Sequence, residues 1–332
     1  MNTPSAILSC DWGTSQLRLQ LVELETGAVL SKCKSNVGIK KMHKQWKKAG
    51  GDRASFFLQG LKVMIEELVG KVGHPLPQVP IVMSGMASSS LGLRELAYAK
   101  LPFDLNGTNL VWELLPASPD FPHNIFLISG IEKQDDVIRG EESELIGLAS
   151  LNADFPSEYM LILPGTHSKH LKIADGKVVD FKTYLTGEMF DILRKHSVLK
   201  NRMARKLKKK MNDGLRQAFL QGVEAAKAPD INRQIFSIRA KSLQGSLRQN
   251  EATYYLSGLL IGHEIQELEI TESSTCVLAA NKKMCTFYQL ALEHVGWERL
   301  LVVDPKVYNQ LAVTAHLHLF NRYFSTARSP IV

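Results

Sequence analysis

Two short glycine-bearing turns carry the side chains best suited to phosphate chemistry. The first reads DWGTS at 11–15 and the second reads PGTHS at 164–168. In each turn a glycine lets the backbone bend tightly, and the neighbouring hydroxyl groups and amides offer hydrogen bonds to phosphate oxygens. Asp11 ends an apolar strand, where a carboxylate can hold Mg²⁺ through water. Together the turns predict phosphoryl transfer, which needs a metal ligand and donors around the phosphate.

The two turns differ in how much they predict alone. The first by itself also fits a hairpin whose aspartate merely caps the turn, and the second adds the charge of Lys169 for a phosphate or a substrate carboxylate. His167 is expected to orient a hydrogen bond, because no second histidine lies at metal-ligand spacing. No GxxxxGK[ST] or GxGxxG motif is present, which excludes a P-loop and a dinucleotide fingerprint. The residues expected to bind phosphate are Gly13, Thr14, Ser15, Gly165, Thr166, His167, Ser168 and Lys169.

A pair of acids lies between the turns, in the segment RGEESELIG at 139–147. Acids in the first turn of a helix complement the helix dipole, which is sufficient to explain them. The alternative is that Glu141 or Glu142 is the general base for a sugar hydroxyl. Arg139, immediately before them, is a candidate to bind an acidic substrate, with two parallel hydrogen bonds if the acid is a carboxylate.

The elements around the turns repeat. Apolar residues 6–10, a turn, an alternating strand at 17–22 and a third strand at 28–34 occur in the same order as segments 159–163, 169–173 and 178–182. This predicts a duplicated α/β architecture, with a cleft between two homologous halves and the glycine turns facing each other. A length of 332 residues also favours two domains.

Further elements follow from apolar spacing and from turn residues. A helix is expected around 56–68 and another at 250–267, in which SGLLIG at 257–262 indicates close helix packing. Thr186 is expected to cap a helix that runs through 193. The other expected elements are strands at 79–83, 124–128, 275–279 and 300–303 and helices at 287–295 and 307–320.

Composition bounds the class of protein. With 45% hydrophobic and 22% charged residues, no apolar run of spanning length and no basic start typical of a signal peptide, the chain is expected to be cytoplasmic. The four cysteines form no CxxC pair, which favours reduced thiols and no zinc. Much of the net charge of +7 lies at 194–210, where no aromatic residues are interleaved. A solvated helix face or a mobile loop explains this run better than nucleic-acid binding.

At this point the motifs resemble a known family. DWGTSQLR at 11–18, RGEE at 139–142, PGTHSK at 164–169 and LTGEMF at 185–190 resemble, in this order, the 2-dehydro-3-deoxygalactonokinase family. The resemblance implies a two-lobed actin-like ATPase (ribonuclease H-like) fold, with duplicated mixed-sheet domains and an interdomain cleft. It further implies ATP-dependent phosphorylation of the 6-hydroxyl of 2-dehydro-3-deoxy-D-galactonate, with Mg²⁺.

The resemblance also implies positions and roles. The N-terminal lobe, 1–135, holds the first phosphate turn and a sugar-side loop, and the C-terminal lobe, 136–332, holds the second turn and the adenosine side. Asp11 is the metal-linked carboxylate, and the implied catalytic residues are Glu141, Glu142 and Asp11. Glu141 is favoured over Glu142 as base, because a glycine precedes it where related sugar kinases place a catalytic aspartate. The implied substrate-binding residues are Arg18, Ser84, Gly85, Met86, Arg139 and Glu188.

Two segments depart from the family pattern. The sugar-side loop reads GMASSSLGL at 85–93, without the usual Gly-Ser and later Gly-Trp, which leaves a related keto-deoxy sugar acid as an alternative substrate. The adenosine-side strand ends in LAAN at 278–281 without a glycine, so a methyl group is expected to narrow the nucleotide pocket. A catalytically impaired nucleotide- or sugar-acid-binding protein is the second alternative. The expected partners are a sugar acid and ATP, with no nucleic acid and no membrane, and a homodimer is left open.

Overall fold

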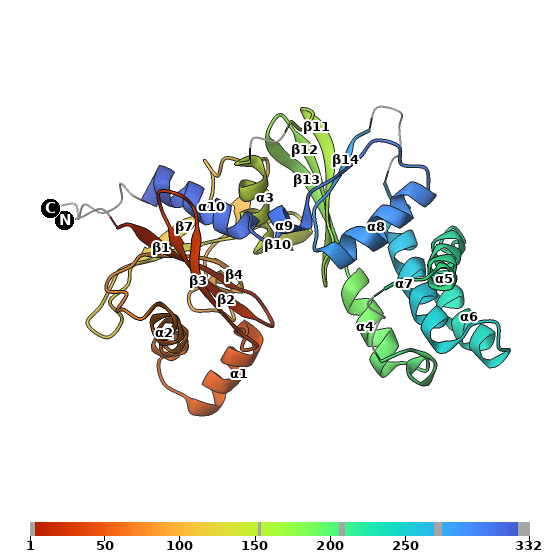
Figure 1. The fold of residues 1–332 in the computed structure, drawn as a ribbon, viewed down its shortest axis with the longest axis horizontal. Coiled ribbons are helices and arrows are strands. Elements are labelled where there is room, and N and C mark those ends of the chain that lie inside the picture. Colours follow the sequence, from red (N-terminus) through yellow and green to blue (C-terminus); the bar gives the residue numbers. More distant parts are fainter. Residues whose placement is uncertain (1–3, 152–153, 206–209, 269–273, 325–332) are drawn as a thin grey trace. The chain divides into compact units, whose positions relative to one another are not determined.

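The computed structural model describes residues 4–151, 154–205, 210–268 and 274–324. The chain divides into two compact units, traced in Figure 1. The first unit comprises Met1–Phe155, Asp175–Asp180 and Asn309–Val332, and the second comprises Pro156–Ala174 and Phe181–Tyr308. The chain therefore returns twice to the first unit, and the lobes 1–135 and 136–332 stay a prediction.

The first unit is built on a six-stranded sheet in the order β3-β2-β1-β4-β8-β7. Its strands are β1 (Ala6–Trp12), β2 (Leu17–Glu23), β3 (Val29–Ser35), β4 (Ile81–Gly85), β7 (Trp112–Leu115) and β8 (Ile125–Ile128), and the short strands nearby are β5 (Ala99–Lys100), β6 (Phe103–Asp104), β9 (Ile131–Lys133) and β10 (Asp136–Ile138). Its helical elements are α1 (Ile39–Ala49), α2 (Arg53–Val72), η1 (Met86–Ser88), α3 (Glu141–Ala149), α10 (Leu311–Leu319) and η3 (Phe320–Phe324).

The register of this sheet brings the ends of its central strands together. The central strand β1 is antiparallel to β2, with Asp11 opposite Arg18, and parallel to β4, with Asp11 beside Ser84. The carboxyl ends of β1 and β4 therefore share one edge of the sheet. In open sheets with parallel strands, ligands bind at this edge.

Helix α10 returns from the far end of the sequence to support this strand. Figure 1 shows it beside α3, and an added Cβ on Gly147 of α3 would lie only 2.1 Å from Leu311 O. Ser9 Oγ of β1 lies 2.8 Å from His316 Nδ1. Full burial lowers the pKa of His316 to about 3, so the ring is neutral where it contacts β1. The helix expected at 307–320 is thus broken, with α10 beginning only at Leu311.

The second unit repeats the strand order of the first. Its strands are β11 (Glu158–Leu163), β12 (Ser168–Ala174), β14 (Cys276–Leu278), β15 (Leu300–Val302) and, from Phe181 onward, β13 (Lys177–Tyr184), in the order β15-β14-β11-β12-β13. As β1 does with β2 and β4, β11 pairs antiparallel with β12 and parallel with β14. The duplicated architecture predicted from the sequence is therefore confirmed.

Helices make up the rest of the second unit. They are α4 (Thr186–His196), η2 (Lys200–Arg202), α5 (Asp213–Ala225), α6 (Ile231–Leu243), α7 (Gln249–Ile265), α8 (Lys282–His294) and α9 (Pro305–Tyr308). Helices α5 and α7 pack so closely that an added Cβ on Gly258 would lie 1.9 Å from Phe219 O, and one on Gly222 would lie 2.1 Å from Tyr255 O. This confirms close packing as the role of the glycines in SGLLIG.

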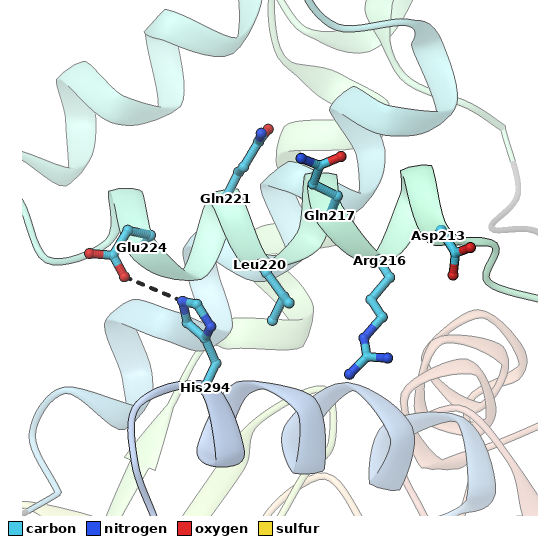
Figure 2. Close-up of a pocket in the computed structure, with 7 residues that line it drawn as sticks. All are labelled: Asp213, Arg216, Gln217, Leu220, Gln221, Glu224 and His294. Carbon is cyan, nitrogen blue, oxygen red and sulfur yellow. Dashed lines mark hydrogen bonds and ion pairs between the residues drawn. The ribbon is translucent and has the colours of Figure 1, made fainter.

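An open groove of about 470 Å³ lies along α5 and α8. Figure 2 shows Arg216 and Leu220 on the side of α5 that faces α8, while His294 at the end of α8 reaches Glu224 at 3.3 Å. Both side chains of this pair are accessible to water, which screens their interaction, so the pair contributes little to stability. The groove is a shallow depression of the surface between α5 and α8, and no site is assigned to it.

The cysteines and the helices can be compared with what the composition predicts. The four cysteines are buried, and none of them forms a disulfide in the structure. In the part of the chain that the structure describes, no helix combines the length and the apolar character needed to cross a bilayer.

Candidate functional site

The first glycine turn is held from behind by a helix that the sequence analysis did not predict. Gly13 N donates to Gln16 O at 2.9 Å, and the first amides of α1 donate to Gly13 O and Thr14 O at 3.0 and 3.2 Å. Gly38, just before α1, approaches so closely that an added Cβ would lie 2.4 Å from Thr14 O. Thr14 and Ser15 keep their side chains exposed, as phosphate donors require.

Asp11 lies at the edge of the first sheet with a basic partner. Arg18 Nη1 donates to Asp11 Oδ2 at 3.0 Å, and the side chain of Asp11 is 28% exposed while that of Arg18 is 57% exposed. Burial raises the pKa of Asp11, the nearby Arg18 opposes this, and the charge of Glu141 raises the pKa further. Two carboxylates of the first unit therefore lie close enough to influence each other.

Glycines let Asp11 and Glu141 approach. Gly85, at the end of β4, has a φ of 84°, and an added Cβ there would lie 2.9 Å from Trp12 O and 3.3 Å from Asp11 Oδ1. Gly140, with a φ of 110°, directly precedes α3, and its added Cβ would lie 3.6 Å from Gly85 Cα. Both glycines have the left-handed conformation that side chains disfavour. They bring the start of α3 against the ends of β1 and β4.

The two acids at the start of α3 differ in accessibility. Glu141 is partly exposed and its Oε2 accepts a hydrogen bond from Arg139 N at 3.1 Å. Glu142 is 0% exposed, and its Oε2 accepts from Gly140 N at 2.6 Å, while its Oε1 is buried without a hydrogen-bond partner. Burial first, and the charge of Glu141 second, raise the pKa of Glu142 to about 8. Glu142 is therefore neutral near pH 7.

The burial of Glu142 predicts a pH-dependent stability. Below about pH 4.5 its carboxyl is protonated in both the folded and the unfolded state, and between about pH 4.5 and 8 only the unfolded state loses the proton. Stability from this group is therefore lost as the pH rises through that window. Glutamine cannot ionise, so the free energy of unfolding of Glu142→Gln should not fall with this group's titration. Relative to the wild type, it should therefore rise by on the order of 3 kcal/mol when the pH is raised from about 5 to about 8. Urea unfolding of both proteins at the two pH values measures this, and parallel pH dependences would contradict it.

Arg139 is engaged with the sugar-side loop. Its Nη1 donates to Ser88 O at 2.6 Å and to Ser88 Oγ at 2.5 Å, and its guanidinium lies 4.1 Å from the centre of the Tyr98 ring. Ser84 is 1% exposed, whereas Met86 is partly exposed at the start of η1. The structure thus brings Arg139 and the loop together, with the arginine as a support of the loop.

The second glycine turn is bound to the start of α4. An added Cβ on Gly187 would lie 2.4 Å from Gly165 O, and Glu188 N donates to Thr166 O at 2.9 Å. His167 Nε2 lies 2.6 Å from Glu188 Oε2, which places the predicted substrate residue Glu188 against the turn. The residue before α4 is Leu185, and the hydroxyl of Thr186 makes no cap hydrogen bond, so its expected capping role is wrong.

The side chains of this turn divide into exposed and buried ones. Gly165, Thr166 and His167 are exposed, whereas Ser168 is 0% and Lys169 is 4% exposed. Lys169 Nζ donates to His167 O at 2.8 Å, which holds the turn from inside. The exposed surface that this turn offers to a phosphate therefore consists of Gly165, Thr166 and His167.

A cavity of about 700 Å³ opens beside this turn within the second unit. Its lining residues come from the turn, α4, α7, α8 and the chain near them, and they are Pro164, Gly165, Thr166, Thr186, Gly187, Phe190, Asp191, Arg194, Arg205, Ser257, Leu260, Ile261, Asn281, Lys283, Met284, Phe287 and Tyr308. The apolar side chains of the lining suit a flat ring, and the polar and charged ones can bind polar groups of a ligand. This size and composition are typical of a nucleotide-binding cavity.

Basic side chains give the cavity a positive character. Arg194 pairs with Asp191 at 3.0 Å, and desolvation and the charge of Arg194 both lower the pKa of Lys283. From the sequence, residues 194–210 are expected to form a solvated helix face or a mobile loop, but the side chain of Arg194 is only 14% exposed and also donates to Arg205 O. That interpretation is wrong for Arg194, and residues 206–209 of the run lie outside the described residues.

The missing glycine at 278–281 does not narrow this cavity. Ala279 and Ala280 are both 0% exposed and are not among its lining residues, whereas Asn281 lines it and caps α8 through its side chain. The methyl groups therefore take no space from this cavity, and the expected narrowing of a nucleotide pocket stays a prediction. The lining residues of α4 and α7 were missed because apolar helix residues give no signal that separates a cavity wall from a core.

The carboxylates fit a magnesium site in which the protein supplies only one or two ligands. In the described part of the chain, no group of three or more His, Cys, Asp or Glu residues can hold a metal by itself. Mg²⁺ bound with phosphates needs only one or two carboxylates, because waters and phosphate oxygens complete its shell. Asp11, partly exposed at the sheet edge, meets that requirement.

Comparisons with known proteins point in one direction. A family model described as 2-keto-3-deoxy-galactonokinase matches residues 11–312. A protein of Rhizobium meliloti (strain 1021), named "Probable 2-dehydro-3-deoxygalactonokinase", is 30% identical over 305 residues, which cover 89% of this chain and 92% of that protein. The 2-dehydro-3-deoxygalactonokinase of Escherichia coli (strain K12) is 28% identical over 296 residues, covering 87% and 90%.

A solved structure agrees with these relatives. A crystal structure from Sinorhizobium meliloti, described as a candidate 2-dehydro-3-deoxygalactonokinase, matches with a TM-score of 0.74 and 27% identity over 96% of this chain and 99% of that one. With the strand order repeated in both units, the expected fold class, a duplicated α/β fold of the actin-like ATPase type, is confirmed.

Proposed function

Because this chain belongs to the 2-keto-3-deoxy-galactonokinase family, we propose that it transfers the γ-phosphoryl group of ATP to the 6-hydroxyl of 2-dehydro-3-deoxy-D-galactonate, with Glu141 as the base. The family confirms the resemblance drawn from the sequence. The observation that carries the proposed chemistry is the approach of Asp11 and Glu141, made possible by two glycines with positive φ.

Glu141 and Glu142 have different roles in this proposal. A base must reach the substrate hydroxyl and must be ionised, and Glu141 is the partly exposed member of the pair. Glu142 is fully buried and is kept neutral by its surroundings, so it holds Gly140 in place through the hydrogen bond from Gly140 N. Glu141 therefore accepts the proton as the hydroxyl oxygen bonds to phosphorus and the bond to ADP breaks.

The nucleotide is proposed to bind in the cavity of the second unit. ATP supplies the phosphoryl group when bound, and Mg²⁺ held with the help of Asp11 neutralises charge on its phosphates. Gly165, Thr166 and His167 present exposed amides and side-chain groups to phosphate oxygens, and Arg194 and Lys283 add positive charge along the wall. Ser168 and Lys169 stabilise the turn from behind.

The substrate acid is proposed to bind near the edge of the first sheet. Arg18 is exposed beside Asp11 and suits a carboxylate, while Arg139 fixes the loop that begins at Ser84 and Gly85. Met86 and Glu188 stay predicted contacts. Use of ATP and of a metabolic acid supports a cytoplasmic location, and a homodimer stays a prediction that light scattering can check.

A coupled assay of ADP release tests the proposed function. The purified protein with ATP and Mg²⁺ should turn over 2-dehydro-3-deoxy-D-galactonate, with a larger kcat/KM than for keto acids derived from other hexonates. Phosphorus NMR of the product should show a phosphate ester at the terminal carbon. Turnover only with another keto-deoxy acid would reassign the substrate, and no turnover with any of them from folded protein would refute the kinase assignment.

A further inference from the structure

A buried carboxylate lies beneath the second glycine turn. Glu264, near the end of α7, is 2% exposed. Its Oε1 accepts hydrogen bonds from Ser168 Oγ at 2.7 Å and from His170 Nε2 at 2.8 Å. Its Oε2 accepts from Tyr288 OH at 2.7 Å and from the hydroxyl of Thr186. Four donors from four places in the chain therefore converge on one side chain.

This arrangement matches the chemistry of an ionised carboxylate. A carboxylate only accepts hydrogen bonds and has about four lone-pair positions, so four donors can satisfy it. A buried carboxylate is tolerated when its oxygens are fully hydrogen-bonded, and His170 Nε2 is one of the partners here. An amide at this position has only one accepting oxygen, and its NH₂ group would face donors. The network is therefore specific for a carboxylate.

The network connects the parts that surround the cavity. Ser168 ends the glycine turn, Thr186 begins α4, and Tyr288 lies on α8. The turn and the three helices α4, α7 and α8 all contribute residues to the cavity wall, but Glu264 and Tyr288 are not among them. Tyr288 is 0% exposed and its hydroxyl also lies 3.2 Å from Ser168 Oγ. Glu264 thus determines where the turn and the walls stand without itself lining the cavity.

The contact between the turn and α4 makes this placement sensitive. Because an added Cβ on Gly187 would lie 2.4 Å from Gly165 O, the first turn of α4 already touches the backbone of the glycine turn. The bond from Glu188 N to Thr166 O depends on the same spacing. A shift of Thr186 or Ser168 away from Glu264 would therefore move the amides that face the cavity. A displacement of about 1 Å in the groups that position a substrate is sufficient to weaken its binding site.

We propose that Glu264 is a positioning residue for the nucleotide, which it serves by holding the turn 164–168 and the start of α4 at the spacing that phosphate binding requires. This inference rests on the proposed function, because it takes the cavity as the ATP site. It assigns a role to a residue that contacts neither substrate.

Steady-state kinetics with matched variants tests the proposal. Glu264→Gln removes one acceptor from the network, and Tyr288→Phe removes one donor without changing the packing of the ring. Glu267→Gln is the control, since Glu267 is 56% exposed and bonds Lys182 at 2.9 Å at the surface. We expect the KM for ATP to rise about tenfold in Glu264→Gln and about threefold in Tyr288→Phe. The KM for the sugar acid should stay within about twofold of the wild-type value in all three variants, because the sugar acid is proposed to bind at the first sheet.

Amide hydrogen exchange tests the same proposal without requiring enzyme activity. It can be measured on either variant, so the test does not depend on the folding of Glu264→Gln. The amides of 165–168 and 186–188 should exchange faster in Glu264→Gln or Tyr288→Phe than in Glu267→Gln, while those of α2 should not change. Equal exchange in these segments, or an ATP KM equal to that of Glu267→Gln, overturns the positioning role. If the wild type turns over no keto acid, the proposed function fails, and the exchange rates alone decide whether Glu264 holds the turn. If Glu264→Gln does not fold, the exchange rates and the ATP KM of Tyr288→Phe decide between the same two outcomes.

Discussion

Replacing Glu141 by glutamine should lower kcat by about 10²- to 10⁴-fold, the usual contribution of a general base. The amide has nearly the same shape but cannot accept the proton of the 6-hydroxyl. Because Glu141 lies in the first turn of α3 and is partly exposed, its replacement should leave the unfolding midpoint close to that of the wild type. Coupled measurement of ADP release at saturating substrates, with thermal unfolding of the same samples, checks both statements.

Glu142→Gln is the matched comparison for this prediction. The substitution is chemically identical and one residue away, but Glu142 is fully buried and neutral near pH 7, so glutamine imitates the form that is already present. We expect its kcat to fall far less than that of Glu141→Gln. A larger loss in Glu142→Gln than in Glu141→Gln would transfer the role of base to Glu142. Equal and small losses would show that neither carboxylate is the base.

Local sequence patterns were sufficient to predict most strands of the two large sheets, whereas β7 and the short strands β5, β6, β9 and β10 were missed. Strands β1 to β3 and β11 to β13 follow from alternating apolar residues interrupted by glycine turns, and such patterns depend only on neighbours in the chain. Helix α1 was not predicted, because its sequence is mostly basic and it buries only Ile39 and Met42. Its existence depends on the first glycine turn, whose carbonyls accept hydrogen bonds from its first amides. Helices α5 and α6 were also missed, and α5 is fixed by its packing against α7.

The candidate site was predictable where glycines mark it. Gly85 and Gly140 flank residues that motif spacing had already singled out, and their positive φ values explain why glycine stands there. The role of Glu264 was not predictable, because 96 residues separate it from Ser168 and 78 separate it from Thr186. The difference between Glu141 and Glu142 also required the structure. Both acids fit the same sequence pattern, and only the packing of α3 decides which of them is buried.

Replacing Asp11 by asparagine should lower kcat by about 10²-fold or more and raise the Mg²⁺ concentration needed for half-maximal activity by about tenfold or more. A neutral amide binds Mg²⁺ far more weakly than a carboxylate, and Mg²⁺ in this type of site has few protein ligands to compensate. Loss of the exposed pair with Arg18 should cost at most about 1 kcal/mol of stability. Titration of activity with Mg²⁺ measures the effect, with Asp135→Asn, whose side chain is 81% exposed, as the control for loss of one charge. An unchanged Mg²⁺ dependence in Asp11→Asn would remove Asp11 from the metal site, whereas a fall in kcat that excess Mg²⁺ partly restores would support its assignment there.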